Sequence, residues 1–394
     1  MKVATTTKKR LQPLSLISIC CVVAMTQMDS LAEAGKLEFV PSITVSERYD
    51  DNIFYEETDI NEDYITEIAP QLTASYDAKA IKMKTELGAR LELFEQHTEL
   101  NNFQYRANVR LNIDQFTKNT SLFVSDVFRF TPEPPDFLAG KEEEGEVTTG
   151  GIRINRGDSL SNSVRIGLTQ KISPRTDGKI GYVNTTRVFE DPSLVDSTSH
   201  SAQAGLDRQI GPRDVLITGY QYQLFLPKEG EKSQSHNASV GLDHQFTQTF
   251  SANVAIGTTY VLRDPDDAVV FSGSLGVIRR FKLTRLSLGY SRAINTTTGL
   301  SGELTTSQVA SATINRDLTK RLAINLSQDY ATNRSTISDD VDLQSWKTRI
   351  GLKMLLSSWL SGEAEYSHFS QQSDGLGGEF KRNQVFVHLN AYLP

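Results

Sequence analysis

A two-residue alternation of apolar and polar side chains restricts the fold of this chain more than any other feature of its sequence. Between residues 103 and 116, Tyr105, Ala107, Val109, Leu111 and Ile113 alternate with Gln104, Arg106, Asn108, Arg110, Asn112 and Asp114. Because successive side chains of a β-strand point to opposite faces, this pattern predicts a strand between an apolar and a polar medium. The alternation returns at residues 86–93, 322–329 and 384–393, and no long stretch after the first 34 residues has helical spacing. The sequence therefore predicts an all-β protein.

A longer repeat is superimposed on the alternation. Short turn-like segments centre near Ala78, Lys118, Pro174, Pro212, Gln248, Leu283, Lys320 and Ser357. Longer polar connections lie between them, and the longest is expected at about Pro132–Thr149. The pattern predicts about 18 strands of roughly 9–12 residues each, joined by eight short turns and nine long loops.

Short turns at one end of the strands and long loops at the other are typical of barrels in the bacterial outer membrane. A closed barrel leaves no unpaired backbone edge in lipid, and an even number of strands brings both termini to the periplasmic side. A soluble β-sandwich, propeller or solenoid has a similar alternation, but the polar face here is too rich in Arg, Asn, Asp and Gln for a packed core. We therefore expect a transmembrane, antiparallel, up-and-down β-barrel of about 18 strands around an aqueous lumen.

The first 34 residues have the features of a secretory signal peptide. Lys8-Lys9-Arg10 is a positive segment, Leu11–Met25 is apolar, and Ala32-Glu33-Ala34 fits a small-x-small cleavage pattern. A membrane anchor is disfavoured because the apolar segment is short and contains polar residues. We expect residues 1–34 to be cleaved off and residues 35–394 to form the barrel. Both cysteines, Cys20 and Cys21, lie in the cleaved segment, which excludes a disulfide framework and a cysteine-based metal site.

Aromatic side chains on the apolar face form two predicted belts, as expected at the two membrane interfaces of a barrel. The belt near the long loops contains Tyr220, Tyr222, Tyr260, Tyr290, Tyr330 and Tyr366, and the belt beside the short turns contains Phe116, Phe246, Phe281 and Trp359. Polar residues interrupt the apolar face just before several short turns, namely Gln170, Arg208, His244, Arg279 and Arg316. We expect these side chains to reach lipid headgroups, with outer-membrane lipid or lipopolysaccharide as a partner.

The polar face is expected to line the lumen. The candidate contacts for a sugar or another solute are Arg90, Arg106, Asn108, Arg110, Asn112, Arg165, Arg187, Gln203, Gln221, Lys347 and Arg349. Register counting from the connections pairs Glu92 with Arg106 and Arg349 with Glu365 as cross-strand salt bridges in the wall.

Several functions are excluded or disfavoured. Carboxylates two residues apart, such as Glu363 and Glu365, suggest glycoside hydrolysis, but in a repeating barrel they are more simply wall residues. The six histidines have no metal-ligand spacing, so we expect no catalytic site, no metal and no cofactor. The net charge of −7 disfavours nucleic acid as a partner.

A series of short motifs runs along the chain in a fixed order. The first, at the end of the first predicted strand, is Tyr49-Asp50-Asp51-Asn52-Ile53-Phe54, a Y-x-D-N-hydrophobic pattern. The others are Ile68-Ala69-Pro70, Phe128–Pro135, Ser161-Asn162-Ser163, Phe189–Leu194, Gly211–Asp214 and Tyr220–Tyr222. Together they resemble a family of bacterial outer-membrane β-barrel porins that occur with exopolysaccharide, capsule and exosortase gene clusters. One departure is the C-terminus, where Leu393-Pro394 follow the aromatic Tyr392 on which such barrels usually end.

The resemblance implies a place in polysaccharide secretion, beside a periplasmic polysaccharide-export protein that lacks its own outer-membrane pore. We therefore expect a non-enzymatic channel that serves as the exit pore for an exopolysaccharide, gated by the loop at Pro132–Thr149 or by a periplasmic partner. A diffusion porin for small solutes is the main alternative, favoured by charge rows of opposite sign facing each other across a constriction. A structural or adhesive surface protein is the third candidate, and it requires larger loops than this chain has.

Overall fold

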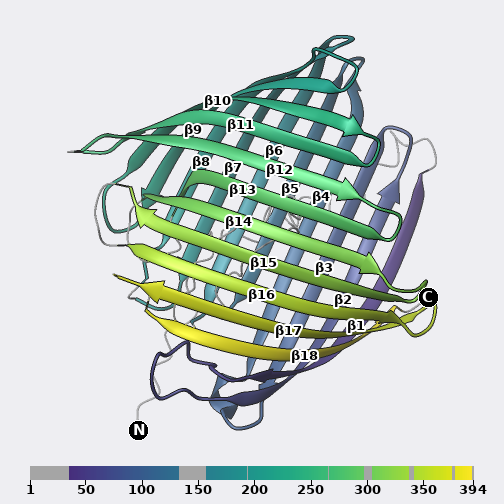
Figure 1. Ribbon diagram of the computed structural model, residues 1–394, viewed down its shortest axis with the longest axis vertical. Coiled ribbons are helices and arrows are strands. Elements are labelled where there is room, and N and C mark those ends of the chain that lie inside the picture. The colour runs from purple at the N-terminus through teal and green to yellow at the C-terminus, as the bar shows by residue number, and fades with distance from the viewer. Residues whose placement is uncertain are drawn as a thin grey trace.

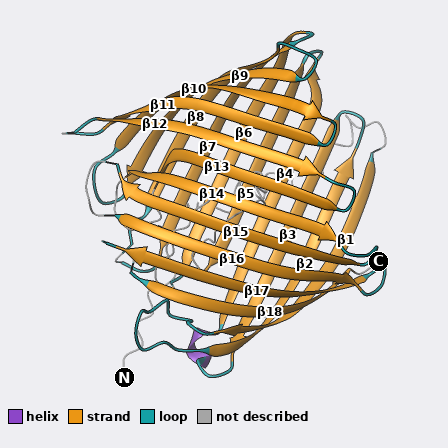
Figure 2. Cartoon of the chain, viewed as in Figure 1, coloured by secondary structure: helices purple, strands orange, loops and turns teal. Residues whose placement is uncertain are grey.

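A computed structural model describes residues 35–132, 157–192, 194–264, 266–296, 304–336, 341–374 and 378–392. These residues form antiparallel strands that close into a barrel, with one short 3-10 helix, η2 (Thr98–Leu100) (Figures 1 and 2). The strands are β1 (Lys36–Asp50), β2 (Asp63–Asp77), β3 (Ile81–Phe94), β4 (Asn102–Thr117), β5 (Thr120–Thr131), β6 (Ser159–Ser173), β7 (Thr176–Phe189), β8 (Ser197–Gln209), β9 (Asp214–Pro227), β10 (Ser233–Thr247), β11 (Phe250–Leu262), β12 (Ala268–Arg280), β13 (Thr284–Thr296), β14 (Leu304–Asp317), β15 (Leu322–Ser335), β16 (Asp342–Leu355), β17 (Leu360–Ser373) and β18 (Phe380–Tyr392). No helix in these ranges is long and apolar enough to cross a membrane.

The 18 strands form one ring in which each strand pairs with its neighbours along the chain, and β1 also pairs with β18. The predicted all-β, up-and-down barrel of about 18 strands is therefore confirmed, and all eight predicted short turns join consecutive strands. In Figure 1, β11–β18 cross in front of β2–β7, which form the far wall. The strands contain 12 to 16 residues, more than the predicted 9–12, because they continue beyond the length that a tilted strand needs to cross the hydrocarbon layer.

The two ends of the ring differ in their connections, and both terminal strands meet at the end with the short turns. Lys36, the first residue of β1, pairs with Asp77 beside the first short turn. At the other terminus, the backbone N–H of Tyr392 donates to the carbonyl of Trp359 in the last short turn, at 2.8 Å. The predicted signal peptide (residues 1–34), residues 133–149 of the predicted long loop and the last two residues lie outside the described part of the chain.

The outer face of the ring is apolar. Large hydrophobic side chains that point outward and are exposed include Leu87, Ile180, Leu206, Val254, Leu288, Ile350 and Val387. At the long-loop end, several outward tyrosines direct their hydroxyls to a polar side chain on the next strand: Tyr220 to His236 (2.7 Å), Tyr290 to Gln308 (3.0 Å) and Tyr366 to Asn383 (2.8 Å). These contacts give each phenol a hydrogen-bond partner at the level where the apolar band ends.

One polar pair interrupts the outer face at mid-height. Asp126 of β5 stands opposite Val109 and Val164, two outward residues, so its carboxyl group also lies on this face. Asn162 of β6 donates from Nδ2 to Asp126 Oδ1 at 2.6 Å, and both residues are only 8% exposed. An unsatisfied polar group in hydrocarbon is costly. The hydrogen bond between Asn162 and Asp126 lowers the cost of placing each of these side chains on the outer face. The sequence pattern around β5 does not reveal this pair.

The Y-x-D-N motif lies at the seam where β1 meets β18. Asp50 accepts a bidentate contact from Arg382, with Nε at 2.9 Å and 3.0 Å from the two carboxylate oxygens. Asp51 accepts from the backbone N–H and from the side-chain amide of Asn383, both at 2.6 Å. Asn52 donates to the carbonyl of Lys381 at 2.8 Å. Three successive residues of the motif therefore bind three successive residues of β18, and the motif holds the ring closed.

Replacing Asp51 with alanine is expected to weaken the seam, because the change removes two short hydrogen bonds from a carboxylate. Bonds to charged groups contribute about 1.5–3 kcal/mol each, so we expect the free energy of unfolding to fall by roughly 2–4 kcal/mol. Urea unfolding of the refolded barrel, followed by tryptophan fluorescence, measures this change. Asp264→Ala, at an exposed loop carboxylate, is the matched control. Equal stability of Asp51→Ala and the control would contradict the role of the motif in closure.

Candidate functional site in the barrel lumen

Arginine side chains on the inner face gather along one side of the lumen. We call this set the arginine arc; its members are Arg382 (β18), Arg48 (β1), Arg90 (β3), Arg106 and Arg110 (β4), Arg129 (β5), Arg165 (β6) and Arg187 (β7). The register shows that they share one face: Arg106 is opposite Arg129, and Arg110 and Arg165 are both opposite Ser125. In the ring the arc spans β18 to β7, and β2 contributes Glu67 where its neighbours contribute arginines.

The centre of the arc is a buried ion-pair cluster. Arg48 contacts Glu67 (Nη1–Oε1, 3.2 Å) and Glu92 (Nη2–Oε1, 3.4 Å), and all three side chains are almost completely buried. Arg90, whose side chain is 46% exposed, lies 3.8 Å from the second oxygen of Glu67. Asn102 also donates to Glu92 at 3.0 Å. The cluster places alternating charges from β1–β3 in the wall, and Arg90 extends from it into the lumen.

A cavity of about 480 Å³ lies against this cluster. Its walls include Arg48, Arg90, Arg106, Arg129 and Arg382, with Glu67 as the carboxylate among them. Arginine side chains therefore outnumber carboxylates among the residues that line this part of the lumen.

The wall on the other side of the lumen, β8–β12, carries hydroxyl and amide side chains in its long-loop half. They are linked to one another along the wall: Gln221 donates to Ser201 (2.8 Å), Gln223 to Ser199 (3.0 Å) and Asn237 to Thr259 (2.7 Å) and Ser272 (2.9 Å). A second cavity, of about 240 Å³, lies against these residues. The lumen thus has an arginine-rich side and a neutral, hydrogen-bonding side.

The predicted lumen residues all stand at inward positions of the register. However, Asn108, Arg187 and Lys347 are 1%, 7% and 3% exposed, so they are built into the wall and offer little surface to a solute. Asn108 donates to Glu86 across the strands at 3.2 Å. Contact of the remaining predicted residues with a sugar stays a prediction.

Both predicted cross-strand pairings are wrong in register. Glu92 is opposite Asn102, whereas Arg106 is opposite Gly88, so the connection between β3 and β4, which contains helix η2, is centred earlier in the chain than the prediction requires. Asp63 holds this connection by accepting the backbone N–H groups of Glu95, Gln96 and His97. The actual ion-pair partner of Glu92 is Arg48.

The pairing predicted between Arg349 and Glu365 fails by two residues. Arg349 is opposite Ser367, and Glu365 is opposite Gly351. The guanidinium of Arg349 instead lies 3.8 Å from the carboxylate of Asp329 on β15. The turn between β16 and β17 sets this register, and its geometry was not readable from the alternation of side chains.

The long-loop mouth of the lumen is bridged by apolar contacts. Phe189 and Leu194, at the end of β7 and in the loop after it, pack against the buried Val341 and Leu343 at the start of β16. In a ring of eighteen strands, β7 and β16 are nine places apart, so this contact joins opposite sides of the barrel. From the first loop, Tyr55 packs against Phe369 and Phe380, and its hydroxyl accepts from Arg382 at 3.2 Å. The mouth is therefore narrowed by side chains that hold the loops inward.

A pair of carboxyl groups lies at the same rim. The backbone N–H of Glu190 donates to the carbonyl of Asp158 at 2.8 Å, which brings the two acids together. Burial, and then the neighbouring Glu190 carboxyl group, raise the pKa of Asp158 above its ordinary value. The carboxyl group of Asp158 therefore keeps its proton to a higher pH than a carboxyl group in a fully solvated loop.

A closed ring of paired strands, an apolar outer band and a charged, polar lumen define the class of protein. The chain has the architecture of a bacterial outer-membrane β-barrel. Residues 221–392 match the model of a family described as "Putative beta-barrel porin 2". No curated protein sequence matches the chain.

Solved structures from two bacteria are similar to the chain at low sequence identity. OccK2 (OpdF) of Pseudomonas aeruginosa is 12% identical, with a TM-score of 0.49 over 90% of this chain and 98% of that chain. OccK11 (OpdR) of the same organism is 14% identical, with a TM-score of 0.48 over 92% and 99% of the two chains. OccAB4 of Acinetobacter baumannii is 13% identical, with a TM-score of 0.46 over 90% and 98%.

Replacing Arg48 with methionine is expected to destabilise the barrel, because the change leaves Glu67 and Glu92 buried without their shared cation. Breaking one side of a buried ion pair costs about 3–5 kcal/mol. The combined variant Arg48→Met, Glu67→Gln, Glu92→Gln is expected to recover most of this loss, since it removes the stranded charges. Urea unfolding measures both variants. A combined variant less stable than Arg48→Met would contradict this account.

Replacing both Phe189 and Leu194 with serine is expected to open the long-loop mouth. Loss of about 2 kcal/mol of apolar burial shifts the balance between bridged and open loops by roughly thirtyfold toward the open form. Single-channel recording in planar bilayers would show a larger or longer-lived conductance. Ile60→Ser, at an exposed apolar loop residue, is the matched control. An unchanged conductance of the double variant would show that the bridge does not limit the channel.

Proposed function

We propose that the protein is a non-enzymatic channel for anionic, hydroxyl-rich carbohydrate, and specifically the exit pore for an acidic exopolysaccharide. The observation that carries this proposal is the arginine arc, which faces a wall of hydroxyl and amide groups across the lumen. Guanidinium groups bind carboxylates or phosphates on a sugar chain, while serine, asparagine and glutamine exchange hydrogen bonds with its hydroxyls. Contacts distributed along the lumen favour movement over tight binding.

In this proposal the short-turn end, where both terminal strands meet, faces the periplasm, and the long-loop end faces outward. A periplasmic polysaccharide-export protein would deliver the chain to the short-turn end. The apolar bridge at the long-loop mouth supports a gate that closes the lumen when no polymer passes. The resemblance of the Y-x-D-N motif and the segments after it to barrels of exopolysaccharide gene clusters supports the same role.

A diffusion porin for small acidic solutes is the second candidate, and the same arginine arc favours it. The two functions differ in the size of the permeating molecule. Rows of opposite charge on facing walls would favour a general ion-selective constriction. In the long-loop half of β8–β12, the side chains that face the arc are instead the hydrogen-bonded hydroxyl and amide groups, and the inward Asp207 and Asp243 lie nearer the short turns.

Conductance in planar bilayers tests the proposal. We expect an anion-preferring current that polygalacturonate blocks at lower concentration than dextran of equal size. Arg90→Gln combined with Arg106→Gln is expected to weaken the block by polygalacturonate about tenfold, since each guanidinium contributes on the order of 1 kcal/mol at a partly solvated site. Arg316→Gln, on the outer face, is the matched control.

Three outcomes separate the candidates. Block by the acidic polymer, together with loss of surface polysaccharide when the gene is deleted, supports the exit pore. Permeation of monomeric galacturonate in liposome swelling, without block by the polymer, supports the diffusion porin. Unchanged surface polysaccharide after deletion of the gene rejects the export role.

A further inference from the structure

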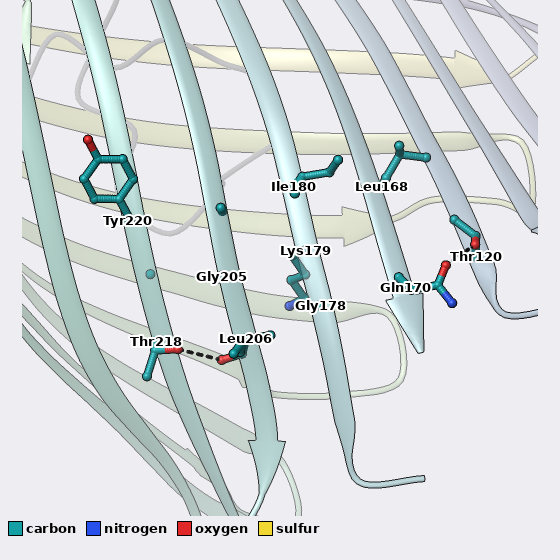
Figure 3. Close-up of a pocket in the computed structure, with 12 residues that line it drawn as sticks. Thr120, Leu168, Gln170, Gly178, Lys179, Ile180, Gly205, Leu206, Thr218 and Tyr220 are labelled. Atoms are coloured by element: carbon teal, nitrogen blue, oxygen red, sulfur yellow. Dashed lines mark hydrogen bonds between the residues drawn. The ribbon is translucent and has the colours of Figure 1, made fainter. Parts of the chain in front are cut away.

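A hollow in the outer face crosses β5–β9 near the short-turn end (Figure 3). Its volume is about 670 Å³. Small residues form its floor, namely Gly178, Ala204 and Thr218, and larger residues form its sides, namely Leu168, Ile180, Leu206 and Tyr220. The register explains this shape, because Ala204 stands between Ile180 and Tyr220, and Gly178 stands opposite Leu206. The hollow is therefore an apolar groove between side chains that project toward lipid.

A second hollow, of about 500 Å³, continues the groove toward the short turns. It is lined by the turn at Ser173–Thr176 and by Arg208, Gln209, Ile210 and Leu216. Along β8, Arg208 is the next outward residue after Leu206, and it stands opposite Thr176 and Leu216. The apolar groove thus leads directly to two guanidinium groups, those of Arg175 and Arg208.

These two arginines present positive charge to the second hollow. No ion pair among the described residues involves Arg175 or Arg208. Of the acids nearby, Asp177 and Asp207 stand at inward positions, where Asp207 accepts from Lys179, and Asp214 lies 2.6 Å from His244. Both arginines are exposed, and Thr176 stands directly beside Arg208. An anion that enters this hollow meets two cations and a hydroxyl group.

We propose that the two hollows form one binding site for an anionic phospholipid. An acyl chain fills the groove over Gly178, Ala204 and Thr218, and the phosphate lies between Arg175 and Arg208. The site faces the membrane, its apolar part lies on the hydrocarbon side, and its cations lie at the end of the strands, where headgroups are found. A phospholipid is therefore the occupant that matches both the shape and the charge.

The inference rests on the membrane position of the barrel. The proposed orientation adds only that the lipid belongs to the periplasmic leaflet. A lipid held across five strands would brace β5–β9, a part of the ring away from the β1–β18 seam.

Native mass spectrometry of the delipidated, full-length barrel in detergent tests the site. The probes are phosphatidylglycerol and phosphatidylcholine with identical acyl chains. We expect one phosphatidylglycerol to bind more tightly than phosphatidylcholine. Each cationic residue near a lipid surface contributes about fivefold to affinity, so Arg175→Gln with Arg208→Gln is expected to weaken phosphatidylglycerol binding about 25-fold. Ala204→Phe fills the groove and is expected to weaken binding of both lipids.

The barrel provides matched controls for Ala204 and Arg208. Ala312 and Arg316 of β14 are outward residues at the same distances from their short turn as Ala204 and Arg208 are from theirs. Ala312→Phe and Arg316→Gln should leave binding unchanged. Equal losses in these controls, or full binding by the double arginine variant, would overturn the proposal. Because the assay needs neither a bilayer nor a permeating solute, its failure is distinct from failure of the channel function.

Discussion

The structure depends on one constraint: in lipid, every backbone N–H and C=O group of the strands must find a partner within the sheet. An unsatisfied group costs several kcal/mol, so the sheet must close, and closure requires β1 to meet β18 in a defined register. The side chains of Asp50, Asp51 and Asn52 secure this junction by binding Arg382, Asn383 and the carbonyl of Lys381. The motif that most resembles a known family thus acts at the one place where the ring joins residues more than 300 positions apart.

The closed ring separates lipid outside from the lumen inside, so the two faces of each strand carry different kinds of side chain. Outside, examples of polar groups are the hydrogen-bonded pair Asn162 and Asp126, and Arg208 near the end of its strand. Inside, charge is tolerated at high density because water and opposite charges surround it. The buried contacts of Arg48 with Glu67 and Glu92 stiffen the wall, and Arg90 remains exposed beside them. The inner wall therefore both stabilises the barrel and presents charged side chains to solutes.

The number of strands, the alternation of short turns with long loops and the inward or outward direction of each side chain could be predicted, because they depend on local features. Alternation along a strand needs only its own residues, and a turn such as the one at Pro212 is marked by its own Gly and Pro. The partner of Glu92 could not be predicted, because helix η2 and the hold of Asp63 on its connection decide the register. The packing of Phe189 against Val341 and Leu343 could not be predicted from the sequence either, because it joins strands on opposite sides of the ring.

The sequence by itself determined that this chain forms a β-barrel with an apolar outside and a polar inside, because the period of two is a property of each strand alone. Only the tertiary structure decided how the charges inside are grouped, that arginines gather on one side of the lumen, and where the outer face is hollowed beside Arg175 and Arg208. These features depend on which residues stand at the same level on neighbouring strands. Register sets that level, and register is fixed by turns, connections and ring closure acting together.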